Sequence, residues 1–439
     1  MILVSTDPEV AKLIAAESKR QQEVLEMIPS ENYASAAVRE AIGSVLTNKY
    51  SEGYPHKRYY QGNTYIDAIE DIAIDRAKKL FGVPHANVQP YSGSPANAAV
   101  YFAILAPGDT IMGLALSAGG HLTHGHPAIT FSGKYFHSVQ YDVDADGWLN
   151  MEEISQLSRK TKPKMIVVGT TAYPRIFDWK HWKVIADEAG ALLLADISHI
   201  AGLVVGGVHP SPVQYADIVM TTTHKTLRGP RGALLMVTES GLKKDPKMAE
   251  KIDKAVFPGI QGGPHDNVTA AIAIALKEAD SQSFRAYAKQ IVANAKVLAK
   301  SLTDQGLKLT TGGTDNHLMV IDLRPQGLSG NVVAEALEVA GIVVNKNSVP
   351  HDPNPPFYPS GIRLGTPAVT TRGMKEPEMQ QIGQWISQVI NIVKDNHLPG
   401  DKETRNAFFV DFRKKIIKNK ELLTIAANVQ ALCRHFPVP

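Results

Sequence analysis

Two side chains that could act together in one reaction, Asp196 and Lys225, lie at or just after the ends of apolar runs. Asp196 follows the apolar run 191–195, and Lys225 comes shortly after the run 218–220. In open α/β sheets, ligands bind beyond the carboxyl ends of the strands. A lysine there can form a Schiff base with pyridoxal phosphate, while a carboxylate keeps the pyridinium nitrogen protonated. The same pair could instead form a structural ion pair at the strand ends, and the two residues alone favour that interpretation.

The segment 91–97, with the sequence YSGSPAN, contains residues suited to binding a phosphate. We predict Ser94 as a helix N-cap and Pro95 as the first helical residue, so that free backbone N–H groups and the helix dipole point toward an anion. No Gly-Lys-Ser/Thr follows, which excludes a P-loop. An ordinary capped helix is the alternative.

Three histidines, His121, His124 and His126, lie close together in a glycine-rich stretch. Three imidazoles can ligate zinc. However, the stretch 119–126 holds no cysteine or acidic residue, and its glycines do not favour a rigid ligand helix. We therefore expect no metal, and stacking of one imidazole ring on an aromatic cofactor is the alternative use.

A parallel sheet would place Asp196 and Lys225 at the same edge. Short apolar runs at 165–168, 192–195 and 218–220 alternate with helical stretches, which is typical of βαβ units. Between the first two runs, Asp178 is expected to cap a helix that Gly190 ends. The sequence thus predicts an α/β fold with a buried, mainly parallel sheet.

The two ends of the chain are predicted to be largely helical. A helix capped by Asp7 should begin at Pro8 and run through Ile28 until Pro29 stops it. One long helix is expected over about 268–302 and leads into a second domain. That domain should contain strands at 317–323 and 341–345 and helices near 379–393 and 404–417.

Composition excludes several classes of protein. The chain has 439 residues, of which 44% are hydrophobic, enough for two or three globular domains. A net charge of +3 does not indicate a nucleic-acid binder. The single cysteine, Cys433, suits a reducing compartment, so we expect a cytoplasmic protein. The first ten residues lack signal-peptide features. The sequence contains no run of about 18 apolar residues, so we expect no membrane span.

Five motifs together resemble the serine hydroxymethyltransferase (glycine hydroxymethyltransferase) family over nearly the whole chain and in the family's order. They are VQPYSGS at 88–94, GGHLTHG at 119–125, ADISHIAGL at 195–203, TTHKTLRGPRG at 222–232 and SGIRLGTPA at 360–368. The resemblance implies an aspartate-aminotransferase-like fold with a large α/β domain and a smaller C-terminal α+β domain. We expect an N-terminal arm at 1–58, the large domain at 59–285 and the small domain at 286–439.

The resemblance also implies a role for each matching residue. The catalytic residues would be Lys225, Glu52, His121 and Asp196. The pyridoxal phosphate would further contact Ser92, Gly93, Ser94, Thr171, His199 and His224, together with Tyr50 and Gly263 across a dimer interface. Serine or glycine would contact Ser30, Glu52, Tyr60 and Arg363, and the one-carbon carrier would bind near Leu116, Gly120, Glu52 and Asn347.

The implied reaction interconverts serine and glycine in a homodimer and passes the one-carbon unit to tetrahydrofolate or a related pterin. A threonine-type aldolase that needs no pterin is the nearest alternative, and a binding protein without catalysis is another. A nucleic-acid role would depend on the basic residues between 413 and 420, which we expect to form a solvated helix face.

The chain departs from the common family pattern at several positions. The family commonly has alanine at Pro29, glycine at His56 and Gln61, and glutamine at Pro95. Where it usually has Leu-Met-His, this chain has His265, Asp266 and Asn267. This last departure lies close to the predicted phosphate and carrier region.

Overall fold

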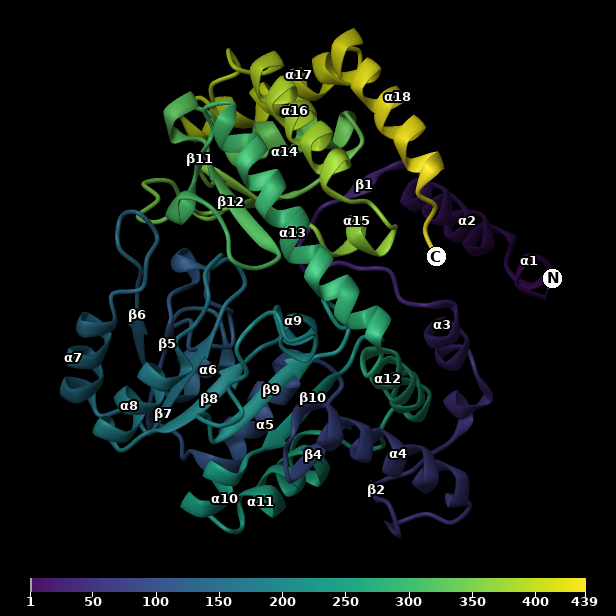
Figure 1. Cartoon of the computed structure of the whole chain (residues 1–439), viewed down its shortest axis with the longest axis vertical. Coiled ribbons are helices and arrows are strands. Elements are labelled where there is room, and N and C mark those ends of the chain that lie inside the picture. The colour runs from purple at the N-terminus through teal and green to yellow at the C-terminus, as the bar shows by residue number, and fades with distance from the viewer. Residues whose placement is uncertain (1) are drawn as a thin grey trace. The chain divides into compact units, whose positions relative to one another are not determined.

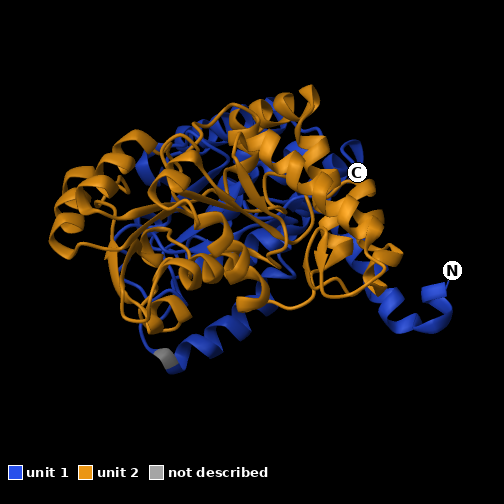
Figure 2. Cartoon of the chain, turned by 90° about the horizontal axis from the view of Figure 1, so that it is seen from below, with its two compact units in different colours: residues 1–33, 293–439 blue, residues 34–292 orange. Residues whose placement is uncertain are grey.

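The computed structural model describes residues 2–439, which divide into two compact units (Figure 2). Unit 2 comprises residues 34–292, and unit 1 comprises residues 1–33 and 293–439. These contact-defined divisions differ from the boundaries expected at 58 and 285. Residues 1–33 cluster with the C-terminal part because β1 (Leu25–Glu26) pairs in parallel with β13 (Ile342–Val343).

Unit 2 is built on a sheet with the order β4-β10-β9-β8-β7-β5-β6 (Figure 1). Its strands are β4 (His85–Asn87), β5 (Thr110–Leu114), β6 (His137–Tyr141), β7 (Met165–Gly169), β8 (Leu192–Asp196), β9 (Ile218–Thr222) and β10 (Ala233–Val237). The five strands from β9 to β6 run parallel, whereas β10 is antiparallel to both of its neighbours. The predicted α/β fold with a mainly parallel sheet is confirmed.

Helices pack around this sheet, and this explains why its strands read as continuous apolar runs. Every residue of β7, β9 and β10 is buried. The helices of unit 2 are α3 (Ala36–Ile42), α4 (Thr64–Phe81), α5 (Gly93–Ile104), α6 (Phe131–Tyr135), α7 (Met151–Thr161), α8 (Trp179–Ala189), α9 (Ala201–Val205), α10 (Glu239–Lys244), α11 (Met248–Lys254) and α12 (Asp266–Ala279).

The ends of α8 confirm the predicted cap and stop. The Asp178 carboxylate accepts a hydrogen bond from the His181 N–H, and Gly190 ends the helix in the left-handed conformation with φ 67°. The helix buries Trp179 and Trp182 in the hydrophobic core of unit 2. Local capping chemistry therefore set both boundaries of this helix.

Two predicted helices have different boundaries. Helix α2 (Pro8–Glu23) begins at the predicted cap, Asp7, but ends at Glu23, because the next residues are extended and enter β1. The single helix predicted over about 268–302 is wrong. The chain instead forms α12 and α13 (Gln282–Asp304), with a break at residues 280–281.

Unit 1 contains a four-stranded antiparallel sheet with the order β11-β12-β15-β14. These strands are β11 (Lys308–Leu309), β12 (Leu318–Asp322), β14 (Asn345–Asn347) and β15 (Gly361–Gly365). Its helices include α1 (Ile2–Thr6), α14 (Gly330–Val339), α15 (Pro367–Thr371), α16 (Glu376–Ile392), α17 (Lys402–Ile416) and α18 (Lys420–His435). Within residues 2–439, no helix is both long enough and apolar enough to cross a membrane.

Arg372, which is only 5% exposed, ties the C-terminal ends of α2 and α18 together. Its guanidinium donates to the carbonyls of Val24 (2.7 Å) and Gln22 (2.9 Å) at the end of one helix and of Cys433 (3.0 Å) and Phe436 (2.5 Å) at the end of the other. A positive charge also interacts favourably with the C-terminal end of a helix dipole.

We therefore expect Arg372→Leu to lower the free energy of unfolding by about 3 kcal/mol, because several buried carbonyls lose a charged donor. Urea denaturation of the purified variant measures this loss. Arg434→Leu, at an exposed position on α18, is the matched control and should change stability by less than about 0.5 kcal/mol. Equal effects of the two substitutions would contradict this role for Arg372.

Candidate active site

A pocket lies at the carboxyl-end edge of the unit 2 sheet, where β5, β7, β8 and β9 run parallel. Its lining comes from the last residues of β8 and β9, from the residues that follow the four strands, and from the first turns of α5. The lining residues are Gly93, Asn97, His121, His124, Thr170, Thr171, Asp196, Ser198, His199, Met220, Thr222 and Lys225. The structure thus brings Asp196 and Lys225 together, as the sequence predicted.

The Asp196 carboxylate in this pocket is hydrogen-bonded through both of its oxygens. His124 Nε2 lies 2.8 Å from Oδ2, and Asn97 Nδ2 donates to the same oxygen at 3.2 Å. Ser198 donates to Oδ1 from its hydroxyl (2.6 Å) and from its backbone N–H (3.1 Å). Burial by itself would raise the pKa of Asp196, but the bond to His124 and nearby positive charges, including Lys225, lower it. The carboxylate is therefore held in its ionised form.

His121 is a largely buried ring beside Asp196. Its Nδ1 lies 2.7 Å from Thr123 Oγ1, and the Thr123 hydroxyl also accepts from Asn97 Nδ2 at 2.8 Å. Burial, and next the neighbouring His124, lower the pKa of His121 to about 4. The ring is therefore neutral at neutral pH, which suits stacking on a flat partner better than an ion pair.

Lys225 sits in the turn that follows β9. The Arg228 N–H donates to the Lys225 carbonyl at 3.1 Å, and Arg228 adopts a left-handed φ of 57°. The Arg228 guanidinium lies over the Tyr287 ring, 4.2 Å from its centroid. Burial, followed by the charge of Lys225, lowers the pKa of His224 to about 3. The turn thus carries a lysine next to an imidazole that stays neutral.

The N-terminus of α5 forms a cradle beside Lys225. The N-cap is Ser92 rather than the predicted Ser94, because the helix already begins at Gly93. A Cβ on Gly93 would come within 2.9 Å of Thr222 Cγ2, so only glycine keeps this space open. Among the described residues, no group hydrogen-bonds to the buried Thr222 Oγ1. Backbone N–H groups at a helix N-terminus and an adjacent hydroxyl suit a phosphate.

The loop after β5 meets the loop after β7. The Thr170 hydroxyl donates to the Gly119 carbonyl at 2.7 Å, and the Thr171 hydroxyl donates to the same carbonyl at 3.1 Å. A Cβ on Gly120 would collide with the Leu114 carbonyl, so this close approach requires glycine. The predicted carrier residues Leu116 and Gly120 lie on this loop.

A second cluster in unit 2 joins predicted site residues from separate segments. Tyr50 Oη donates to Glu52 Oε1 at 3.0 Å, and the Tyr50 and Tyr60 rings meet edge to face with centroids 5.1 Å apart. A Cβ on Gly263 would lie 3.2 Å from the Tyr50 ring. The described residues that line the pocket around Lys225 include none of these four.

Three predicted site residues belong to unit 1. Arg363 lies in β15 and is 9% exposed; its Nε donates to Asn345 Oδ1 at 2.9 Å. Burial lowers the pKa of Arg363 to about 10. Asn347 ends β14, and Ser30 lies in a partly exposed turn after β1.

Sequence reasoning missed five polar side chains that shape the pocket. They are Asn97, Thr123, Thr170, Ser198 and Thr222. Asn97 is four residues after Gly93, on the same face of α5, and Ser198 is two residues after Asp196. Helical spacing could have suggested Asn97, and the Asx-type contact of Ser198 could have been inferred from its position.

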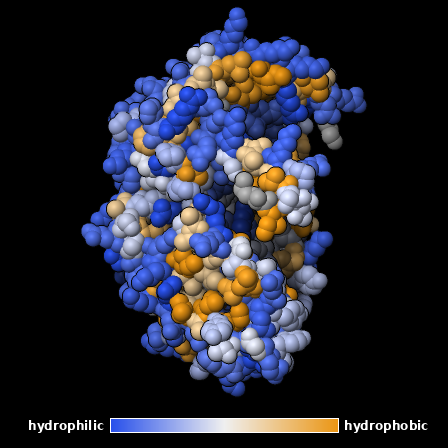
Figure 3. Space-filling model, turned by 90° about the vertical axis from the view of Figure 1, so that its right-hand side faces the viewer, coloured by the Kyte–Doolittle hydropathy of each residue, from blue (hydrophilic) through white to orange (hydrophobic). Residues whose placement is uncertain are grey.

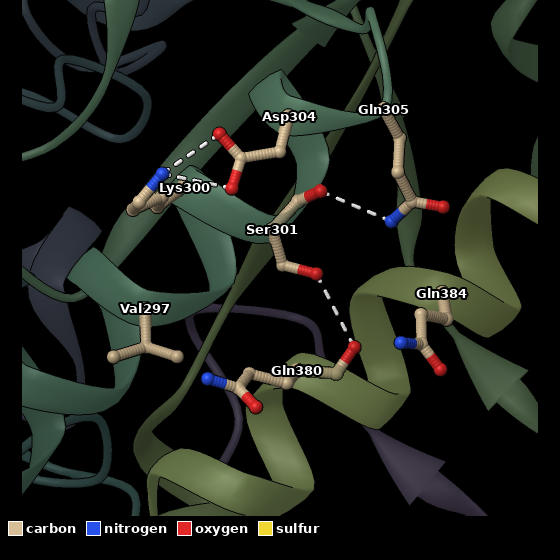
Figure 4. A pocket seen from close by; sticks show the side chains of 7 residues that line it. All are labelled: Val297, Lys300, Ser301, Asp304, Gln305, Gln380 and Gln384. Atoms are coloured by element: carbon tan, nitrogen blue, oxygen red, sulfur yellow. Dashed lines mark hydrogen bonds and ion pairs between the residues drawn. The ribbon is translucent and has the colours of Figure 1, made fainter.

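A second hollow lies between α13 and α16 (Figure 4). Lys300 pairs with Asp304 at 2.8 Å, and the Ser301 hydroxyl donates to the Gln380 carbonyl at 3.2 Å. These polar groups satisfy one another on an open helix surface. The hollow contains none of the predicted site residues, so the pocket around Asp196 is the stronger candidate.

The pocket around Asp196 fits pyridoxal phosphate. An ionised carboxylate suits a protonated ring nitrogen, Lys225 supplies a primary amine, and the Gly93 cradle suits the phosphate. Within residues 2–439, no group of three or more His, Cys, Asp or Glu side chains is arranged to hold a metal ion. His124 instead bonds to Asp196, and His121 bonds to Thr123.

Comparison with known proteins identifies a family. The family model described as "Serine hydroxymethyltransferase" matches residues 3–386. A relative of that name from Acidothermus cellulolyticus is 56% identical over 438 residues, covering 100% of this chain and 97% of the relative. Relatives with the same name from Sorangium cellulosum and Desulfotalea psychrophila are each 54% identical and cover 100% of this chain and 96% of their own length.

The lowered pKa of His121 predicts how stability depends on pH. An unfolded imidazole binds a proton below about pH 6.5, whereas the folded ring does so only near pH 4. The unfolded state therefore binds more protons in this window, and stability falls as the pH falls through it. His224 acts in the same direction.

We expect His121→Gln to reduce the loss of unfolding free energy between pH 7 and pH 5 by about 2 kcal/mol. Urea denaturation of the cofactor-free protein at the two pH values measures it. An identical pH dependence in the variant and the wild type would show that His121 is protonated normally in the fold.

Proposed function

The chain belongs to the serine hydroxymethyltransferase family, and we propose that the pocket around Asp196 and Lys225 is where it interconverts serine and glycine. Members of this family use pyridoxal phosphate and pass the one-carbon unit to tetrahydrofolate. The observation that carries the assignment of the site is the buried, ionised Asp196 in one pocket with Lys225 and the open N-terminus of α5.

When bound, pyridoxal phosphate supplies an electron sink for the bond electrons left on the amino acid's Cα. Lys225 would bind the cofactor covalently, and Asp196 would hold the proton on the ring nitrogen. His121 would stack on the ring, and His199 would lie near its phenolic oxygen. Thr171 and His224 complete the proposed ring contacts, and Ser92, Gly93 and Ser94 would bind the phosphate.

Arg363 is the proposed partner of the amino acid's carboxylate. The guanidinium presents a planar fork that matches two carboxylate oxygens. Asn345 orients this fork through Nε, and burial strengthens the attraction to an anion. With the carboxylate held, the Cα–Cβ bond of serine can be kept in the orientation that breaks most readily. Ser30 and Tyr60 are proposed to contact the same substrate.

Glu52 is the proposed acid–base group. It would take the proton of the serine hydroxyl while the Cα–Cβ bond breaks, and return it in the reverse reaction. Tyr50 Oη, which donates to Glu52 Oε1, would hold the carboxylate in one orientation. Leu116, Gly120 and Asn347, together with Glu52, are the proposed contacts of tetrahydrofolate.

We propose a homodimer in which each active site uses residues of both subunits. Figure 3 views the side that carries α3, α4 and α12 and shows apolar residues gathered on part of it. Val45, in the turn before Tyr50, is 80% exposed, and Ile42 and Ile72 are also exposed. A second copy would cover these residues, and twofold symmetry would use the patch twice. Tyr50, Glu52 and Gly263 would then reach the partner's pocket.

A cytoplasmic location is also part of this proposal. The chain has one cysteine, Cys433, and it is buried in unit 1. Thiols persist in reducing compartments, where structural disulfides are rare. The paired charges of the basic helix α17, such as Arg413 with Glu335 at 2.5 Å, support a solvated surface rather than a nucleic-acid site.

Substitution of the two central residues tests the cofactor assignment. Lys225→Ala should abolish the yellow absorption band of the lysine-bound cofactor, because alanine has no amine. Asp196→Asn should keep that band and lose nearly all serine–glycine turnover, because a neutral amide does not hold the ring proton. Absorption spectra and a tetrahydrofolate-dependent assay measure both effects. A retained band in the first variant, or near-normal turnover in the second, would refute the assignment.

Hybrid dimers test whether Glu52 acts in the partner's site. Chains carrying only Lys225→Ala and chains carrying only Glu52→Gln should each be nearly inactive as homodimers. After mixing and refolding, hybrid dimers should contain one intact site, so activity should recover to about a quarter of wild type by statistical pairing. Verified hybrid dimers with no recovered activity would place Glu52 and Lys225 of one chain in the same site.

A further inference from the structure

The backbone on both sides of Glu52 is fastened by one arginine. The Arg58 guanidinium donates to the carbonyls of Ser51 and Gly53, each at 2.9 Å. Its side chain is only 3% exposed. Gly53 is in the left-handed region with φ 102°, where a Cβ would collide with the Lys57 carbonyl. The carbonyls of the residues before and after Glu52 are therefore held in place.

The same arginine is anchored to α4. It forms ion pairs with Asp67 at 2.8 Å and with Glu70 at 2.6 Å. Gln89 Nε2 donates to Glu70 at 2.7 Å and to the Gly53 carbonyl at 2.9 Å. This side of the network uses the hairpin β2 (Gly53–Tyr54) and β3 (Lys57–Arg58), which immediately follows Glu52.

The other side of the network comes from Asp266, the first residue of α12. Ser51 Oγ lies 2.6 Å from Asp266 Oδ1 and 2.9 Å from Oδ2. Ser51 is completely buried and Asp266 is 4% exposed, so water does not compete for this bond. A buried hydrogen bond to a charged acceptor is stronger and more directional than an exposed one. It joins α12 to the residue directly before Glu52.

Asp266 is also where this chain departs from the common family pattern, which has an apolar methionine at that position. A methionine accepts no comparable hydrogen bond from Ser51. The adjacent His265 ring stacks on Tyr91 with centroids 4.1 Å apart, and Tyr91 Oη donates to the Gly263 carbonyl at 2.6 Å. Asp266 thus bonds to Ser51, next to Glu52, and His265 stacks on Tyr91, which bonds to Gly263.

We propose that Asp266 is a positioning residue for Glu52 and acts through Ser51, which rests on the acid–base role proposed above for Glu52. Asp266 fixes the Ser51 side chain, Arg58 fixes the carbonyls on either side, and the Glu52 carboxylate is left to meet Tyr50 Oη. Asp266 itself touches neither the substrate nor the cofactor in this proposal.

Steady-state kinetics of the holoenzyme test this role. Asp266→Ala should lower kcat about tenfold to a hundredfold and leave KM for serine within about twofold, because a proton-transferring group is misplaced without loss of substrate contacts. Ser51→Ala should have the same effect, and the double variant should be no worse than either single variant. Asp266→Asn, which keeps an acceptor oxygen, should recover most of the loss. Lys277→Ala, at an exposed position later on α12, is the matched control and should keep wild-type kcat.

A second readout does not depend on activity. The Tyr59 N–H donates to the Glu52 carbonyl at 2.9 Å, so its hydrogen exchange reports the anchoring of residue 52. Asp266→Ala and Ser51→Ala should each raise the exchange rate at Tyr59, while Lys277→Ala should not. The cofactor absorption band and the sedimentation coefficient should be unchanged in all variants.

Several results would overturn the proposal. They are unchanged kcat and unchanged Tyr59 exchange in Asp266→Ala, equal losses in the Lys277→Ala control, or a loss that follows cofactor release or subunit dissociation. If one alanine variant is insoluble, the other removes the same bond and decides the outcome. Absence of serine–glycine turnover in the wild type would refute the proposed function, whereas the Tyr59 exchange result would still report whether Asp266 anchors residue 52.

Discussion

The central interaction of unit 2 is the set of hydrogen bonds that stabilises the buried negative charge of Asp196. Asp196 is 8% exposed, and a carboxylate removed from water is strongly destabilising unless hydrogen bonds and positive charge compensate it. His124 reaches it from the loop after β5, Asn97 from α5, and Ser198 from its own loop. These elements must therefore converge at one edge of the sheet, and the parallel order of β9, β8, β7 and β5 makes that convergence possible.

The same compensation suits the pocket to the proposed chemistry. An Asp196 held ionised at neutral pH can keep a ring nitrogen protonated, and a neutral His121 can lie against the ring without competing for that carboxylate. Glu52 lies outside the sheet, so no strand positions it. Instead, the residues next to Glu52 are held by Arg58, which is anchored to Glu70 of α4, and by Asp266 of α12. In the proposed mechanism, the buried polar contacts that stabilise these segments also position the residues proposed for catalysis.

The sequence predicted those helices and strands whose ends are determined by nearby residues. The strands β7, β8 and β9 read as apolar runs because helices cover both faces, and Asp178 and Gly190 bound α8 by capping. The prediction failed for the end of α2, which is determined by pairing with residues far away in the sequence. Helical periodicity continues past Glu23, yet the chain becomes extended there because Leu25 and Glu26 pair with residues more than 300 positions later.

The sequence by itself determined which residue types end the apolar runs, so the positions of Asp196 and Lys225 along the chain are enough to mark them as candidates. The periodicity of apolar residues and the ends of apolar runs are local properties, so they can be read directly from the sequence. Only the tertiary structure decided that Asn97, His124 and Ser198 surround Asp196, and that Ser51 bonds to Asp266 across 215 positions. Hydrogen bonds need donor and acceptor within about 3 Å and in line. That placement depends on how whole helices and strands pack, which spacing along the chain does not encode.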